Sequence, residues 1–249
     1  AVMELENDGF DAASAAQDMI QLANSVSGAS WAVARPVDAR VGTGKIAVGL
    51  FYRSDIFTAI GPAQTLTGPE FKRSRQPLAQ VLQLLPNGEK ILIVVNHLKS
   101  KGSCPQSGVN TNHDKQGCWN DLRTVSAKKM TDWTLKLAAN AGTENILILG
   151  DMNAYRIEDP IDVIRDAGFT ELMDKKQEEV YSFIYRGRRG TLDYAFTSDA
   201  LYKKVVDAFI WHVNTDLPEK PDPTQPWLGF SDHDPVVVDI RLRQSKTSD

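Results

Sequence analysis

The residues of this sequence that could do chemistry are carboxylates, an amide and histidines placed where apolar runs begin or end. They are Glu4, His97, Asp151, Asn153, Asp193, Asp232 and His233. Any one of them alone is better explained as a helix cap, a turn former or a hydrogen-bonded structural residue. Several separate places that carry only oxygen or imidazole groups indicate instead one shared site. Carboxylate oxygens prefer magnesium, calcium or manganese to zinc, and an imidazole can take a proton from water near neutral pH.

The elements that must position these residues are short strands alternating with helices. Apolar runs of strand length cover residues 31–33, 46–52, 78–85, 91–95, 146–149, 192–196, 205–213 and 236–240. Apolar residues repeat at helical spacing over 12–26 and 119–139, and Pro160 begins a shorter helix that ends near Gly168. Asn87-Gly88 predicts a tight hairpin that joins antiparallel strands over 78–85 and 90–97. We expect one α+β domain over residues 1–249, with the active groups in loops at strand ends.

The composition is that of an ordinary globular protein. Of 249 residues, 42% are hydrophobic and 24% are charged, which excludes general disorder and collagen-like repetition. The longest apolar runs, such as 91–95, are strand-sized and far shorter than the roughly 20 residues that cross a bilayer. We therefore expect no membrane partner.

The charges are unevenly distributed along the chain. The net charge of −4 argues against a protein that coats nucleic acid through overall positive charge. Residues 99–129, however, hold six lysines and arginines against two aspartates, and further cations lie at 72–75 and 186–189. Each cluster alone is best explained as solvated surface charge, but together they could attract a ligand that carries phosphate.

The two cysteines, Cys104 and Cys118, are separated by a loop rich in Gly, Ser, Asn and Gln that lacks the spacing of a zinc site. This pattern favours a disulfide, with two unpaired thiols as the alternative. Closing a loop of about 15 residues would stabilise the fold by roughly 3 kcal/mol in the chain-entropy model. A disulfide would imply an oxidising compartment.

Five motifs resemble those of the endonuclease/exonuclease/phosphatase superfamily, which includes pancreatic-type deoxyribonuclease and the abasic-site endonucleases. They are MEL at 3–5, NHLKS at 96–100, GDMNA at 150–154, TLDYAF at 191–196 and SDHDPV at 231–236. GDMNA with a distant SDHDPV is highly specific, whereas MEL alone has no weight. The stretch KSKGSCPQSG followed by GCWNDLR is similar, more narrowly, to the secreted bacterial nucleases, whose members often carry further domains before the nuclease domain.

The resemblance implies a four-layer α/β/β/α sandwich of two packed mixed sheets flanked by helices, with the site at one rim. It implies metal ligands (Glu4 and Asp232), residues beside the scissile phosphate (Asp151 and Asn153) and a base that activates water (His233). Asp193 would orient His233. A carboxylate that accepts from one ring nitrogen fixes the tautomer and stabilises the imidazolium that forms when the other nitrogen takes a proton.

The resemblance also implies groups that contact phosphate. His97 lies where the deoxyribonuclease branch has a second histidine, which contacts the phosphate and can protonate the leaving oxygen, whereas abasic-site enzymes have a tyrosine there. Arg75 resembles a phosphate-contacting arginine, whose guanidinium holds two phosphate oxygens in a planar fork; a plain surface cation is the alternative. Four further residues are predicted to contact the nucleic-acid backbone: Lys99, Lys101, Asn120 and Arg123.

Two features of the family pattern have no clear counterpart in this sequence. The opening strand, which carries an asparagine that helps to bind metal, is expected before Ala1. An acidic partner for the phosphate-contacting histidine is expected near residues 31–40, where Asp38 is the only acid.

The sequence therefore predicts hydrolysis of phosphodiester bonds in DNA, with RNA as an alternative substrate, assisted by Mg²⁺ or alternatively by Mn²⁺ or Ca²⁺, with little sequence preference. Two alternatives stay open: a phosphodiesterase for lipid or small phosphorylated substrates, and an inactive module that binds DNA. We expect a monomer that belongs to a longer parent chain and is extracellular or periplasmic, as in secreted bacterial proteins.

Overall fold

A seven-stranded mixed sheet forms the centre of the computed structural model, which describes residues 1–175, 180–217, 224 and 229–242. The strand order is β10-β13-β9-β8-β7-β5, and β6 also pairs with β7. The strands are β5 (Phe57–Ala59), β6 (Gln64–Thr65), β7 (Leu78–Leu84), β8 (Lys90–His97), β9 (Ile146–Asp151), β10 (Thr170–Glu171) and β13 (Asp193–Thr197). β8 and β9 are parallel, and the other neighbours are antiparallel.

The β7–β8 hairpin confirms the expectation from Asn87 and Gly88. Leu82 and Ile91 are partners in an antiparallel register. Gly88 has a φ of 71°, a left-handed conformation that glycine adopts without steric cost. β8 is an almost continuous apolar run because both faces of the sheet are covered.

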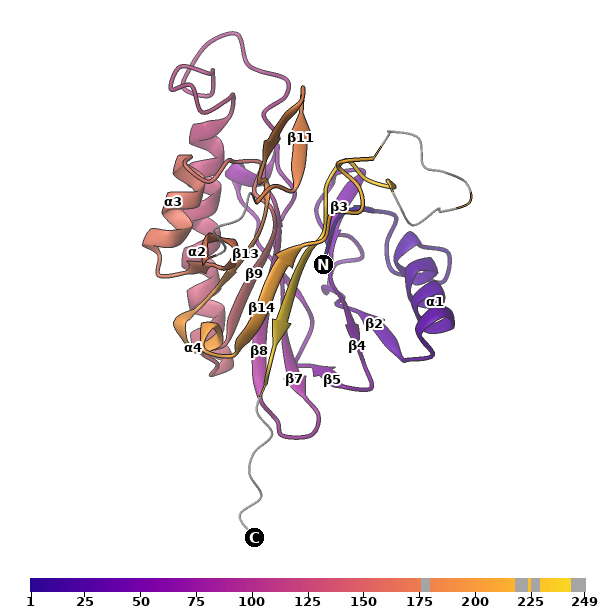
Figure 1. The fold of residues 1–249 in the computed structure, drawn as a ribbon. Helices are drawn as coiled ribbons and strands as arrows, with labels where there is room; N and C mark the ends of the chain where they lie inside the picture. Colours follow the sequence, from indigo (N-terminus) through magenta and orange to yellow (C-terminus); the bar gives the residue numbers. More distant parts are fainter. Residues whose placement is uncertain (176–179, 218–223, 225–228, 243–249) are drawn as a thin grey trace.

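Two helices cover one face of the large sheet (Figure 1): α2 (Asn120–Ala141) and α3 (Asp159–Asp166). The backbone N–H of Gly142 closes the end of α2 on the carbonyl of Ala138, and Pro160 lies in the first turn of α3. Buried apolar side chains of both helices, including Met130 and Ile164, pack in one core with β8, β9 and β13. The predicted helices are therefore present.

The next layer consists of three antiparallel strand pairs. They are β1 (Val2–Glu6) with β3 (Ile46–Gly49), β2 (Trp31–Val33) with β4 (Phe51–Arg53), and β14 (Val205–Ile210) with β15 (Val236–Ile240). Ala47 and Val48 of β3 share a core with Leu78 and Val95 of the large sheet. A second core joins β14 and β15 to the same sheet through side chains such as Ala195.

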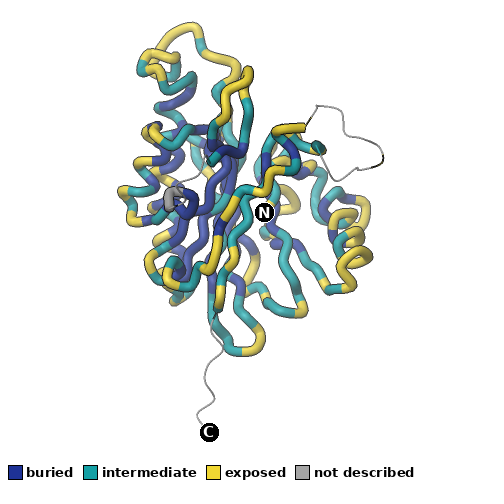
Figure 2. The backbone as a smooth tube through the Cα atoms, in the orientation of Figure 1, coloured by how far each residue is buried: buried dark blue, intermediate teal, exposed yellow. Residues whose placement is uncertain are grey.

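Helix α1 (Ala15–Ser27) forms the outermost layer and buries Ala16 and Ile20 against Leu5 and Val33. The order of layers confirms the predicted α/β/β/α sandwich, and the most buried backbone lies in the large sheet (Figure 2). The second β layer differs from the expected mixed sheet, because in the part of the chain that the structure describes it consists of three separate pairs.

The remaining elements lie around these layers. They are α4 (Asp199–Tyr202), the hairpin of β11 (Phe183–Tyr185) and β12 (Arg188–Gly190), and the 3₁₀ turns η1 (Pro69–Phe71) and η2 (Leu172–Lys175). Between β8 and α2 lies the insert (residues 99–119), which extends beyond the end of the sheet (Figure 1). Cys104 and Cys118 form a disulfide within it, with their Cα atoms 5.3 Å apart, as predicted. Among the described residues, no helix has both the length and the apolarity to cross a membrane.

Candidate active site

Three predicted residues form a row across neighbouring strands at one end of the large sheet. Asp151 is the register partner of His97 in the parallel β8–β9 pair and of Asp193 in the antiparallel β9–β13 pair. Residues in register on adjacent strands project to the same face of a sheet. We call His97, Asp151 and Asp193 the strand-end row; residues far apart in the sequence meet here because of strand order alone.

The GDMN segment shapes the middle of this row. Gly150 has a φ of 139°, and a Cβ atom there would lie 1.9 Å from the backbone oxygen of Asn96, so only glycine fits between β8 and β9. Asn153, at a φ of 48°, donates from its backbone N–H to Oδ1 of Asp151 at 2.7 Å and from Nδ2 to Oδ2 at 2.8 Å. Asn153 therefore holds the Asp151 carboxylate in one orientation.

His233 reaches the row from a separate loop. A bridge between Phe183 and His233 places this loop, and the two rings lie with their centroids 4.7 Å apart. Nδ1 of His233 lies 2.6 Å from Oδ2 of Asp193. An ionised carboxylate only accepts, so Nδ1 donates and the other ring nitrogen, Nε2, is the one that can take a proton.

Ser182 completes this pair, and sequence reasoning missed it. Its side chain is fully buried, and its Oγ donates to Oδ2 of Asp193 at 2.7 Å. The same Oγ accepts from the backbone N–H groups of Leu192 and Asp193, both at 3.0 Å. Ser182 lies in no recognisable motif, and only the fold brings it to Asp193.

The charges of this site shift the acid–base properties of His233 and Asp151. Burial alone would lower the pKa of His233, but its hydrogen bond to Asp193 and the negative charges around the ring raise that pKa from 6.5 to about 9. Asp151 and Asp232 are among those charges. Burial, together with the charge of Asp193, raises the pKa of Asp151 to about 8. Several carboxylates therefore lie close together at the strand-end row and act on one another.

His97 has backbone and carboxylate neighbours but not the predicted acidic partner. Its Nδ1 lies 3.1 Å from the carbonyl oxygen of Met3, so a backbone oxygen of β1, not Asp38, orients the ring. Nε2 lies 3.5 Å from Oδ2 of Asp151 and 4.0 Å from Oε1 of Glu4. Burial is the largest influence on the pKa of His97 and lowers it, which favours the neutral ring. The predicted role of Asp38 is corrected accordingly.

Glu4 and Asp232 lie at the edge of the site. The Glu4 side chain is 68% exposed and lies beside His97, and its charge contributes to the raised pKa of Asp151. Asp232 is exposed, and its charge contributes to the raised pKa of His233. The ligand atoms that Asp151, Asp193 and His233 offer lie within 4.8 Å of one another, and Asp232 does not belong to that group.

The cations predicted to contact phosphate do not share one environment. The backbone N–H of Arg75 donates to the carbonyl of His97 at 3.2 Å, and the charge of Arg75 acts on the His97 ring, so this residue lies beside the row. Lys101 instead forms an ion pair with Glu158 and donates to the backbone of Gln116. Lys101 therefore has partners within the protein.

Burial corrects the predictions for Arg123 and Asn120. Arg123 is fully buried, and its guanidinium donates to the carbonyl oxygens of Lys99, Gln116 and Cys118. Asn120 is 1% exposed, and its Nδ2 donates to carboxylates of α3 and the insert. Neither side chain can contact a substrate directly in this structure, and both hold the insert against the helices.

Asp234 is a second residue that sequence reasoning missed, although it lies inside the SDHDPV motif. It is 2% exposed, and its Oδ1 accepts from the backbone N–H groups of Val213, Asn214 and Thr215. Its own N–H donates to the carbonyl of Ser182 at 2.8 Å. Asp234 therefore ties the loop of His233 to the segment after β14.

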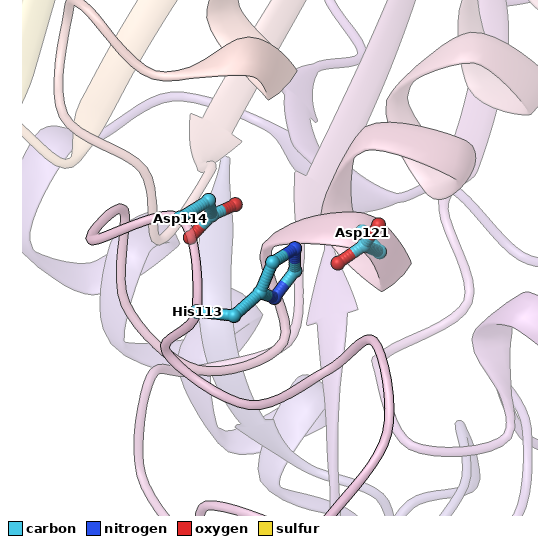
Figure 3. A group of neighbouring side chains, drawn as sticks. All are labelled: His113, Asp114 and Asp121. Carbon is cyan, nitrogen blue, oxygen red and sulfur yellow. The ribbon is translucent and has the colours of Figure 1, made fainter.

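A second group of histidine and aspartate lies outside the strand-end row. His113 and Asp114 of the insert and Asp121 of α2 bring their side chains together, with the His113 ring between the two carboxylates (Figure 3). Asp114 already accepts from the backbone of Gln116 and from Asn120. His113 is exposed and the two aspartates are half-buried, and we assign this group no part in the reaction.

The comparisons with known proteins identify the family of the chain. The model of the endonuclease/exonuclease/phosphatase family matches residues 2–233, and the chain belongs to that family. Members of the family are hydrolases that act on phosphoester bonds. No curated protein sequence matches the chain significantly.

Solved structures share the fold at low sequence identity. A family protein from Leptotrichia buccalis is 15% identical, with a TM-score of 0.60 over 96% of this chain and 86% of its own. The mannosyl-6-phosphatase of Bacteroides thetaiotaomicron is 14% identical, with a TM-score of 0.59 over 91% and 82%. D. rerio TDP2, solved with a single-strand DNA product, is 13% identical, with a TM-score of 0.56 over 88% and 80%.

Proposed function

We propose that this protein hydrolyses phosphodiester bonds in DNA, with RNA as an alternative substrate, with the help of a divalent cation and with little sequence preference. One observation supports the proposal above the others. Nδ1 of His233 is held by Asp193 at 2.6 Å, and the same ring lies against the buried carboxylate of Asp151. An oriented imidazole beside a carboxylate-rich site is what water activation next to a charged phosphate requires.

In this reaction the residues of the site have separate roles. A neutral His233 takes a proton from water at Nε2, and Asp193 stabilises the imidazolium that results. Ser182 and Asn153 hold the two carboxylates in place through the hydrogen bonds described above. His97, oriented by a backbone carbonyl, contacts the phosphate from the other side of Asp151.

The residues present fit a hard divalent cation. The carboxylates of Asp151 and Asp193 offer oxygens within 4.8 Å of each other, and Glu4 lies next to the same His97 edge. Glu4 and Asp151 would hold the cation through carboxylate oxygens, for which Mg²⁺ is our first choice and Mn²⁺ or Ca²⁺ the alternatives. When bound, it neutralises charge that grows on the phosphate oxygens and on the leaving group. Asp232, exposed beside His233, would belong to the outer part of this site.

We also propose that the protein works in an oxidising compartment, outside the cell or in a periplasm, as secreted bacterial nucleases do. The disulfide between Cys104 and Cys118 supports this, because disulfides persist mainly in such compartments. In a strongly reducing cytosol the two cysteines would remain reduced thiols.

Incubation of the purified protein with supercoiled plasmid, linear DNA and RNA tests the proposal. We expect cleavage with Mg²⁺, Mn²⁺ or Ca²⁺ and none after chelation with EDTA. Retention of DNA without cleavage in every metal would favour an inactive binding module. Hydrolysis of a small phosphate ester or of sphingomyelin, with intact DNA, would favour the small-substrate alternative.

A further inference from the structure

Three cations lie together next to the strand-end row. Arg73 and Arg75 come from the turn after η1, and Lys99 lies two residues beyond His97 at the end of β8. Among the described residues, none of the three forms an ion pair with a carboxylate, and the guanidinium groups of Arg73 and Arg75 make no hydrogen bond. Nε of Arg75 is buried and has no partner. Nζ of Lys99 donates only to neutral oxygens of residues 100 and 102.

Trp119 provides the surface on which two of these cations lie. The guanidinium carbon of Arg73 is 5.1 Å from the centre of the Trp119 ring, and Nζ of Lys99 is 5.4 Å from it. Such distances place a cation within reach of the electron-rich face of an indole. The ring is 7% exposed, and its Nε1 donates to the carbonyl oxygens of Gly102 and Ser103.

Trp119 has an uncommon backbone conformation. Its φ of 68° lies in the left-handed region, which a bulky residue adopts at a cost. The neighbouring disulfide at Cys118 and the hydrogen bond from the Trp119 N–H to the carbonyl of Asn110 hold it there. The insert therefore constrains Trp119 at the position where it supports Arg73 and Lys99.

The electrostatics of this cluster differ from those of two neighbouring cations, one in the insert and one in α2. Lys101 is paired with Glu158, and Arg123 is buried among carbonyl oxygens. Burial and the positive charges of Arg123, Arg75 and Arg73 lower the pKa of Lys99. Like charges that crowd together without an anion are stabilised when an anion binds between them.

We propose that Arg73 and Lys99, supported by Trp119, form a second phosphate subsite that binds the phosphate next to the scissile one in a polynucleotide. This inference rests on the proposed function, because it treats the strand-end row as the place where the scissile phosphate binds. Trp119 is too buried to stack on a base, so the subsite recognises backbone phosphate and not base identity. The preferred substrate is therefore a chain with at least two consecutive phosphates.

Dithymidine substrates that differ by one phosphate test the subsite. TpT has only the scissile phosphate, pTpT adds one at the 5′ end, and TpTp adds one at the 3′ end. Because the three cations lie on one side of the row, we expect one of the two additions, and not both, to raise kcat/KM. A charge-assisted contact predicts a gain of about tenfold.

Arg73→Gln removes one charge of the subsite, and Lys136→Gln removes one exposed charge of α2 far from the row. We expect Arg73→Gln to abolish the gain and Lys136→Gln to keep it. Arg73→Lys should retain only part, because an ammonium cannot hold two phosphate oxygens in a planar fork. The subsite would be overturned if the added phosphate raised kcat/KM equally in wild type and Arg73→Gln, or did not raise it in wild type. Cleavage of TpT in the same experiment would leave the proposed function intact.

Binding measured without hydrolysis tests the phosphate subsite independently of the proposed nuclease activity. With EDTA present, labelled octathymidylate is titrated at several salt concentrations, and the slope of log K against log salt is compared. Loss of one phosphate contact should reduce the slope by about 0.7 for a single strand. We expect this reduction in Arg73→Gln and not in Lys136→Gln. If Arg73→Gln reduces the slope in a protein that cleaves no substrate, the subsite is supported although the proposed function fails. An unchanged slope in Arg73→Gln would overturn the subsite.

Discussion

The strand-end row and the insert both carry many polar residues, but they use them in different ways. In the row, side chains from β8, β9 and β13 are brought together by strand register, and each has a partner that orients it. Lys101 of the insert and Arg123 near the start of α2, in contrast, are engaged by the protein itself. Lys99 instead lies next to Arg73 and Arg75, where burial and their positive charges lower its pKa, and none of these three cations forms an ion pair with a carboxylate of the described residues.

The difference shows that a basic segment is not by itself a substrate-binding surface. The positive charge of residues 99–129 suggested contact with nucleic acid, but fully buried Arg123 holds backbone carbonyls together. The acidic and imidazole groups predicted at strand ends, in contrast, lie next to one another in the structure. Substitutions that act on one region and leave the other intact test this difference.

Replacement of His233 by alanine should have the largest effect. We expect kcat/KM on DNA to fall by about 10³-fold, because the group that takes the proton from water is removed. Steady-state cleavage of plasmid DNA measures the loss, and circular dichroism controls for folding. Activity within a few fold of wild type would show that another group is the base.

Asp193→Asn should have a smaller effect, with a loss of about 10²-fold, because His233 remains but loses its orienting carboxylate. The variant also removes a hydrogen bond and a charge that raise the pKa of His233. The pH at which activity reaches half its maximum should therefore move down. An unchanged pH profile would indicate that Asp193 does not act through His233.

Wild-type activity should rise with pH. His233 acts as a base only when neutral, and its pKa is raised from 6.5 to about 9, so activity is lost as pH falls below that pKa. A bound cation opposes the negative charges that cause this shift, so the inflection should lie above 6.5 and below about 9. Below it, kcat/KM should change about tenfold per pH unit. A flat profile from pH 6 to 9 would contradict the assignment.

Removal of the disulfide by Cys104→Ser with Cys118→Ser should affect hydrolysis of TpT least. The row is held by strands, so we expect kcat/KM on TpT to change less than roughly twofold, while the free energy of unfolding falls by about 3 kcal/mol. Urea denaturation measures the second quantity. A loss on TpT as large as that of Asp193→Asn would show that the insert also supports the row.

Local pattern was sufficient for much of the fold. The Asn87-Gly88 turn, the apolar runs of β7, β8 and β9, and the helix of residues 120–141 follow from backbone preferences and hydrophobic periodicity. Asn153 is also explained locally, because it binds the carboxylate of Asp151 two residues away, whereas the need for glycine at 150 arises from the close approach of Asn96 on the neighbouring strand β8. Interactions over short sequence distances leave a recognisable spacing.

The order of residues shows which side chains are present and at which strand ends they lie. Tertiary structure decided their partners: the Met3 carbonyl and not Asp38 for His97, Ser182 for Asp193, and backbone oxygens for Arg123. A lysine or arginine has the same place in a sequence whether it faces water, a carboxylate or a buried carbonyl. Its role follows from contacts between residues far apart in the chain, and those contacts form only when the layers pack together.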